Sequence, residues 1–203
     1  TLDDATFRSL SRAPGSPREV LAGIETAEKA GMHIKVNAVV VRDLNDSEIP
    51  AFAALARERG WEVRFIEFMP LDGDRAWSRE RVVPAAEIRA ALSEGGDLVP
   101  EGMDGPARMY RIADGKGRLG IIASVTEPFC GSCDRIRITA DGKIRTCLFA
   151  TSETDLKGAM RGGAPDEALA EILASAVLGK GPGHLINTER FVQPERAMNA
   201  IGG

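Results

Sequence analysis

Two stretches decide the fold: IKVNAVVV at residues 34–41 and WEVRFIEFM at residues 61–69. Both are short and rich in β-branched or aromatic residues, so we expect each to form a β-strand. Before the first, SPRE at residues 16–19 combines a capping box with proline at the first helical position, and Gly31 ends that predicted helix. A second helix is expected over residues 45–60. This alternation predicts βαβ units and a parallel sheet.

Polar side chains interrupt both predicted strands. Lys35 and Asn37 lie two positions apart in the first, so they share a face, and Arg64 and Glu67 occur in the second. Parallel strands covered on both faces are nearly continuous in apolar residues. The polar positions therefore indicate either the interior of a barrel that holds a ligand or a face exposed to water at a sheet edge.

The pattern changes after the glycine pair at residues 95–96. The strands and helices expected beyond it are strands at 108–113 and 119–125, a hairpin of 135–139 and 143–147 around Asp141-Gly142, and helices at 155–161 and 164–179. We therefore expect an α/β region at 1–96 and an antiparallel region at 97–203, which ends in a glycine- and proline-rich tail.

Composition excludes several classes of protein. The chain has 203 residues, 43% hydrophobic and 28% charged, with a net charge of −4, which argues against general nucleic-acid binding. No apolar run reaches the roughly 18 residues of a membrane span, and the polar start resembles no signal peptide. The start at Thr1 rather than Met suggests that upstream residues are missing. Three cysteines clustered within eighteen positions favour a reducing compartment, hence the cytoplasm, over a disulfide scaffold.

Cys130, Cys133 and Cys147 form the pattern C-x2-C-x13-C. Gly131 removes side-chain bulk between the close pair, and the third cysteine ends the predicted hairpin. Clustered thiolates favour zinc or an iron–sulfur cluster. A structural zinc site needs a fourth ligand, for which His33 and His184 are the available histidines. A four-iron cluster would keep one iron open to substrate. Cluster, zinc and chance proximity all remain open from spacing alone.

Basic residues follow the cysteines. Arg135 and Arg137 are expected on one face of a strand, and Lys143 and Arg145 lie on the returning strand. Guanidinium groups match phosphate and the purine edge by paired hydrogen bonds. Beside a metal site in an acidic chain, this set indicates an anionic ligand, although charged runs more often form a solvated hairpin face.

Taken together, four segments resemble the GTP 3′,8-cyclase family, radical S-adenosylmethionine enzymes of molybdenum-cofactor synthesis. They are VNAVV at 36–40, RFIEFM at 64–69, the cysteine block with RIRITADGK at 135–143, and the terminal IGG. The resemblance runs from about residue 1 to the C-terminus. It implies the C-terminal half of an incomplete TIM-like (βα) barrel, followed by an antiparallel β/α cluster-binding region.

The resemblance also implies roles for individual residues. Cys130, Cys133 and Cys147 match the ligands of a second, substrate-side 4Fe-4S cluster. The GTP-contacting residues would be Lys35, Arg135, Ile136 and Arg137. Met69 matches a methionine beside S-adenosylmethionine, and Arg64, Gly202 and Gly203 match residues at the active site.

The implied reaction converts GTP to 3′,8-cyclo-7,8-dihydro-GTP. In the family, a 5′-deoxyadenosyl radical removes hydrogen from the ribose C3′, and the resulting radical attacks guanine C8. The pathway partner would be the downstream cyclic pyranopterin monophosphate synthase, and a homodimer is a further hypothesis for the assembly. A zinc-binding structural module and a related radical enzyme with a peptide substrate are the alternatives.

The sequence departs from the family in two respects. The C-x3-C-x2-C motif of the first cluster does not occur, because the three cysteines belong to the other motif. We therefore expect a C-terminal fragment or truncated product that does not cleave S-adenosylmethionine by itself. Asp134 stands where the family often has asparagine, and its carboxylate would weaken the local positive field.

Overall fold

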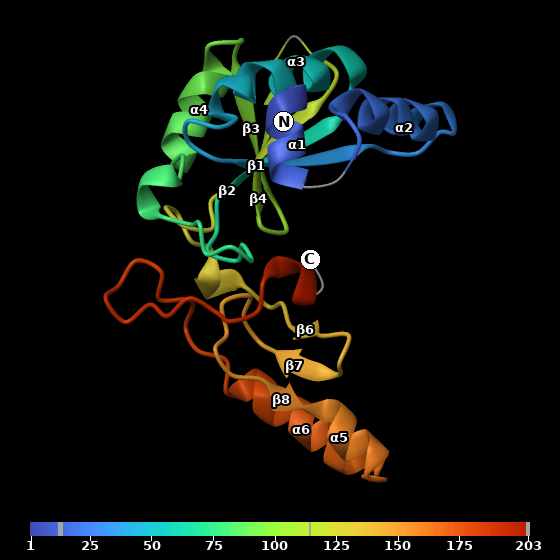
Figure 1. The fold of residues 1–203 in the computed structure, drawn as a ribbon, viewed down its shortest axis with the longest axis vertical. Helices are drawn as coiled ribbons and strands as arrows, with labels where there is room; N and C mark the ends of the chain where they lie inside the picture. Colours follow the sequence, from blue (N-terminus) through green and yellow to red (C-terminus); the bar gives the residue numbers. More distant parts are fainter. Residues whose placement is uncertain (12–13, 114, 202–203) are drawn as a thin grey trace. The chain divides into compact units, whose positions relative to one another are not determined.

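The computed structural model describes residues 1–11, 14–113 and 115–201. The chain divides into two compact units (Figure 1). The first unit comprises Thr1–Phe68 and Arg79–Pro128, and the second comprises Met69–Ser78 and Phe129–Gly203. Among the residues described, no helix combines the length and the apolar character needed to cross a membrane.

A mixed five-stranded sheet forms the centre of the first unit (Figure 1). Its strands, in spatial order, are β1 (Lys35–Val40), β2 (Glu62–Glu67), β5 (Arg118–Ile122), β4 (Ala107–Ile112) and β3 (Leu98–Asp104). β1, β2 and β5 are parallel, whereas β4 and β3 add to them in antiparallel pairs. The predicted parallel pair is thus confirmed, and the sheet continues beyond it.

The first unit contains the two helices that the sequence signals predicted, α2 (Pro17–Lys29) and α3 (Ile49–Arg59), and several others. The others are α1 (Asp4–Ser11), η1 (Asp46–Glu48), η2 (Arg79–Arg81) and α4 (Ala85–Ser93). The predicted capping box starts α2: the Glu19 amide donates to Ser16 Oγ at 3.3 Å, and the Ser16 amide donates to the Glu19 carboxylate at 2.9 Å. Gly60 ends α3 with a φ of 78°, which glycine adopts without strain.

One face of this sheet carries the hydrophobic core. Val63, Phe65 and Leu119 are buried there, and α3 and α4 contribute Phe52 and Ile88 to the same cluster. The rings of Phe52 and Phe65 meet edge to face, with centroids 6.3 Å apart. Along β1 the buried positions alternate with exposed ones at 35, 37 and 39. The sheet is therefore apolar on the helix-covered face and polar on the other.

Glu67, at the end of β2, is fully buried on the helix-covered side. One carboxylate oxygen accepts a hydrogen bond from the Ala85 amide at 2.8 Å, at the start of α4. The other accepts from the amides of Val125 at 2.6 Å and Thr126 at 2.8 Å, and the Thr126 hydroxyl also donates to this carboxylate. Glu67 thus joins the end of β2 to α4 and to the segment after β5, and does not face a ligand.

The second unit contains a small antiparallel sheet with the order β6 (Arg137–Ile138), β7 (Lys143–Arg145) and β8 (Thr154–Asp155). Its helices are η3 (Cys130–Ser132), α5 (Leu156–Arg161), α6 (Asp166–Leu178) and η4 (Met198–Ala200). Gly142, with a φ of 80°, makes the predicted turn between β6 and β7. Ile144, Phe149 and Ile201 are buried in this unit.

The fold confirms a mixed α/β architecture with a separate small antiparallel sheet. α1, β3 and β8 were not anticipated from the sequence. The expected change near residue 96 falls inside the first unit, because β5 pairs with β2 and brings residues 98–122 into the first sheet. The division into functional regions at 1–96 and 97–203 stays a prediction.

Candidate functional site

The three cysteines lie in the second unit, on short segments that flank the small sheet. Cys130 begins the turn η3, and the Cys133 amide closes that turn by donating to the Cys130 carbonyl at 3.1 Å. Cys147 follows β7. All three are half-buried free thiols. A side chain at position 131 would meet nothing within 4 Å outside its chain neighbours, so the expectation that Gly131 relieves crowding between the two cysteines is not supported.

The environments of Cys133 and Cys147 shift the pKa values of their thiols in opposite directions. Burial raises the pKa of the Cys147 thiol, and the nearby Cys130 and Cys133 raise it further, against the backbone hydrogen bond of Phe149 and the charge of Lys180. Burial also acts to raise the pKa of the Cys133 thiol. Hydrogen bonds from Arg135 and the charges of Arg135 and Lys180 outweigh it, so that this pKa is lowered.

Three free thiols form a soft donor set of the kind that binds iron–sulfur clusters or zinc. Within the described ranges, no three or more His, Cys, Asp or Glu side chains are grouped in position to hold a metal ion. Gly183 closes on the first thiol: a Cβ at this position would lie 2.6 Å from the Cys130 Cβ and 3.0 Å from its Sγ. The donor set therefore fits such a group chemically, and its neighbour at 183 has to lack a side chain.

The predicted nucleotide-contacting segment starts directly after Cys133. The Arg135 guanidinium lies over the Phe129 ring, 4.9 Å from its centroid, and Ile136 is exposed. Arg137 is half-buried in β6, opposite Arg145. β6 begins at Arg137, so Arg135 precedes the strand and the regular alternation expected for the two arginines does not apply.

Arg145 has a structural role rather than the expected place in a basic set. Its side chain is 3% exposed. It donates to Glu153 at 2.5 Å and to the carbonyls of Leu148 at 3.3 Å and Ala150 at 2.6 Å. Burial of a guanidinium requires such partners. The basic residues left to face a ligand near the cysteines are consequently fewer than the sequence suggested.

Lys35 and Arg64 come together in the first unit, on the polar face of the sheet. Lys35 Nζ lies 3.4 Å from both Glu62 and Asp104. Arg64 donates to Glu62 through Nε at 2.6 Å and also pairs with Asp104. The charge of Arg64 and then that of Lys35 lower the pKa of the Asp104 carboxyl. Arg118 joins the same network through a 3.2 Å pair with Glu62, which is 1% exposed.

A glycine makes room for Arg64. At Gly120, which is opposite Arg64 in the parallel pairing of β2 and β5, a Cβ would lie 3.0 Å from the Arg64 Cγ and 2.9 Å from the Met109 sulfur. The stem of Arg64 therefore lies over β5, where its charged end reaches the carboxylates.

The remaining predicted site residues are separate from these two groups. Met69 is half-buried at the start of the 69–78 segment, in the second unit, and its carbonyl accepts from the Leu71 amide at 2.8 Å. Gly202 and Gly203 lie outside the described residues. Met198, close to the end, is held by its amide, which donates to the Leu71 carbonyl at 2.9 Å.

Sequence reasoning missed three residues beside these groups: Lys180, Glu62 and Asp104. Lys180 is 47 positions from the cysteine that it contacts, so no spacing rule indicates it. Glu62 is the first residue of β2. A charged residue in a strand that is otherwise apolar could have been recognised from the sequence as a candidate. Asp104 lies on β3, a strand that the sequence did not predict.

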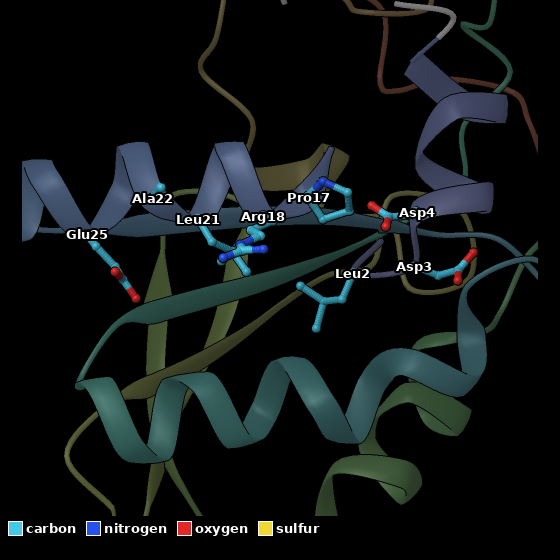
Figure 2. A pocket seen from close by; sticks show the side chains of 8 residues that line it. All are labelled: Leu2, Asp3, Asp4, Pro17, Arg18, Leu21, Ala22 and Glu25. Atoms are coloured by element: carbon cyan, nitrogen blue, oxygen red, sulfur yellow. The ribbon is translucent and has the colours of Figure 1, made fainter. Parts of the chain in front are cut away.

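A hollow of about 690 Å³ opens elsewhere in the first unit, between the N-terminal residues and α2 (Figure 2). Its lining consists of Leu2, Asp3, Asp4, Pro17, Arg18, Leu21, Ala22 and Glu25. None of the predicted site residues is among them, so this hollow has no part in the candidate site.

Comparison with known proteins links these features to a family. Residues 61–186 match the family described as Molybdenum Cofactor Synthesis C. Curated relatives named GTP 3′,8-cyclase include proteins of Streptomyces coelicolor and Rhodopirellula baltica, each 46% identical over the whole of this chain, and one of Corynebacterium glutamicum at 44%. The chain spans 61%, 58% and 56% of these relatives.

The family match covers β2 to β8, both helices α5 and α6, and all three cysteines. It therefore includes the segments that position the thiols and those that carry Arg64 and Arg135. On this evidence, the chain belongs to the Molybdenum Cofactor Synthesis C family.

Proposed function

We propose that this chain is the part of a radical S-adenosylmethionine GTP 3′,8-cyclase that holds a substrate-side 4Fe-4S cluster and binds GTP. Cys130, Cys133 and Cys147 are the proposed ligands. The observation that carries the proposal is that three free thiols lie in one unit of a chain that is 46% identical to a protein named GTP 3′,8-cyclase. A four-iron cluster held by three cysteines would offer an open iron to the guanine base.

The chain's own residues would bind and orient the nucleotide. Arg135, Ile136 and Arg137 form the proposed contact segment beside the cysteines. Arg135 supports this role because it is exposed and its guanidinium is already oriented by the Phe129 ring. Guanidinium groups bind phosphate or the purine edge by paired hydrogen bonds. In a radical reaction, such residues would hold the ribose and the base in a reactive geometry.

The first unit is proposed to be the C-terminal half of an incomplete (βα) barrel. Its three parallel strands β1, β2 and β5, with helices over one face and polar residues on the other, support this interpretation. Lys35 and Arg64, on the polar face, would contact GTP and the reacting centre. Because both pair with Asp104 in this structure, phosphate binding would have to compete with that carboxylate.

Further parts of the reaction belong to the intact enzyme. There we propose a first 4Fe-4S cluster and S-adenosylmethionine, with Met69 beside the latter and Gly202 and Gly203 in the active site. The product, 3′,8-cyclo-7,8-dihydro-GTP, would pass to cyclic pyranopterin monophosphate synthase. We propose a cytoplasmic setting, where thiols stay reduced, no role with nucleic acid or membranes, a homodimer as the assembly, and no activity of this chain alone.

The test is anaerobic reconstitution of the chain with iron and sulfide, followed by titration with GTP under electron paramagnetic resonance. We expect about four irons per chain, as a cubane cluster requires, and a spectrum that changes on addition of GTP. A Cys133→Ser variant should lose the cluster, whereas Ser132→Ala, at the neighbouring position, should retain it.

The outcomes separate the hypotheses. A cluster whose spectrum ignores GTP would refute the nucleotide site while preserving the metal site. Tight binding of one zinc ion in place of iron would refute the cluster and identify a structural module.

A further inference from the structure

The segment that follows α6 lies against Cys130 and Cys133 and against Phe149, which follows Cys147 closely in the chain. It comprises Lys180 to His184, with the sequence KGPGH, and each of three positions in it contacts a different part of the cysteine group. Lys180 reaches Cys133, Gly183 lies against Cys130, and the His184 ring packs on Phe149, two residues after Cys147. We call this segment the clasp.

Lys180 is the polar centre of the clasp. Its ammonium group donates to the carbonyl of Cys133 at 2.6 Å and to the carbonyl of Arg135 at 2.9 Å. The same nitrogen lies 3.6 Å from the Cys133 sulfur, within hydrogen-bond range for this larger atom. A lysine ammonium has three donors, and here three acceptors surround it. The side chain is thereby fixed in position with its charge against one thiol.

Of the other clasp residues, Gly183 lies against Cys130 and His184 packs on Phe149. Gly183 has a φ of 157°, and any Cβ there would collide with Cys130. The His184 and Phe149 rings meet edge to face with centroids 4.8 Å apart. Phe149 is buried, so the contact ties the clasp to the chain just after Cys147. The ends of the clasp are therefore anchored independently of the Lys180 charge.

We propose that Lys180 is a positioning residue that fixes the Cys133–Arg135 backbone and sets the reduction potential of the bound cluster through its charge. This inference rests on the proposed function, since it needs the cluster to be present. Reduction adds negative charge to an iron–sulfur cluster, and net charge and hydrogen bonds to the sulfurs set its potential. A cation held against a ligating sulfur stabilises the reduced state and so raises the potential.

A redox titration of the reconstituted chain tests this role. The three cysteines are the only ones in the chain, so one cluster site contributes to the signal. The variants are Lys180→Met, which removes the charge and the donors, Lys180→Gln, which keeps a donor, and Lys180→Arg, which keeps the charge. Lys157→Met, at an exposed position of α5, makes the same change of net charge elsewhere in the unit.

We expect Lys180→Met and Lys180→Gln to lower the midpoint potential, and Lys180→Arg and Lys157→Met to leave it near that of the wild type. A tenfold change in the ratio of reduced to oxidised cluster corresponds to about 59 mV for a one-electron couple. If Lys180→Met binds less iron than the wild type, the potential of Lys180→Gln decides whether the charge of Lys180 sets the potential of the cluster. If Lys180→Met and Lys180→Gln both leave the midpoint potential unchanged, the proposed role of Lys180 is wrong, although the proposed cluster is not affected. No iron uptake by the wild type would overturn the proposed cluster itself.

Discussion

Replacing Glu67 tests how the first unit holds β2, α4 and the segment after β5 together. The carboxylate is fully buried and accepts hydrogen bonds from three backbone amides and one hydroxyl. Glu67→Ala removes every acceptor. Glu67→Gln keeps one carbonyl oxygen, which can serve Val125 and Thr126, but turns its amide group towards the donating amide of Ala85.

The expected cost follows from these contacts. An acceptor lost from a buried donor costs about 1–3 kcal/mol. In Glu67→Ala, the amides of Val125 and Thr126 lose this acceptor, whereas Ala85 retains a 3.4 Å contact with the Thr126 hydroxyl. With two amides left without this acceptor, we expect a loss of about 2–6 kcal/mol for Glu67→Ala and of about 1–3 kcal/mol for Glu67→Gln.

Thermal unfolding, followed by tryptophan fluorescence, measures the loss. Trp61 is 3% exposed in the first unit, and a Trp77→Phe background removes the second tryptophan from the signal. At about 2–4 °C per kcal/mol for a chain of this size, Glu67→Ala should lower Tm by at least about 4 °C. Amide exchange at residues 125–126 should also accelerate.

Glu87→Ala is the matched control. This glutamate pairs with Arg42 at 2.9 Å, but both side chains are well exposed, and such pairs contribute about 0–1 kcal/mol. If Glu67→Ala lowers Tm no more than Glu87→Ala does, the argument that Glu67 is a structural centre of the first unit is refuted.

Four further substitutions test other parts of the chain. The Arg64 guanidinium and the neighbouring lysine hold the pKa of the Asp104 carboxyl below its usual value, so its stabilising effect exists above about pH 4 and is lost as the pH falls through the lowered pKa. Asp104→Asn should therefore lower Tm at pH 7 but have little effect at acid pH, and an equal effect at both would contradict the ion pair. Gly117→Ala should destabilise by about 3 kcal/mol in urea unfolding, because a Cβ would lie 2.2 Å from one backbone carbonyl oxygen and 2.4 Å from another. Gly23→Ala, with nothing within 4 Å, should be neutral or stabilising instead. In the full-length protein, if it is the proposed GTP 3′,8-cyclase, Arg137→Ala should reduce turnover of GTP while iron content stays constant, and unchanged turnover would remove Arg137 from the proposed substrate site.

Local signals predicted the elements of the fold that depend on neighbouring residues. The capping box before α2, the left-handed Gly60 after α3 and the Asp141-Gly142 turn all occur where the sequence placed them. Each of these features depends on contacts within a few positions of the chain, so the local sequence is enough to predict it. β3 was missed because its exposed residues, PEGM at 100–103, lack an alternating pattern and it forms by pairing with β4.

The parts of the candidate site that are close in sequence could also be predicted from local patterns. Cysteine spacing predicted a donor set whose members are close in sequence, and the structure places all three cysteines in one unit as free thiols. The sequence could not tell which polar residues of the first two strands lie on which face of the sheet. In the structure, Lys35 and Arg64 share the polar face with Glu62, whereas Glu67 accepts from backbone amides on the helix-covered face. Arg145 likewise proved to be a buried partner of Glu153, which its position in a basic run did not indicate.

Residue type and short spacing were enough to indicate the family, the three-cysteine pattern and the alternation of strand and helix. Which charged side chains are buried partners within the fold and which lie on an exposed face became known only from the tertiary structure. It paired Asp104 with residues 40 and 69 positions away, and brought Lys180 to a cysteine 47 positions away. Such contacts depend on how strands and helices pack, and the energy of a charged group is set by the partners that packing supplies.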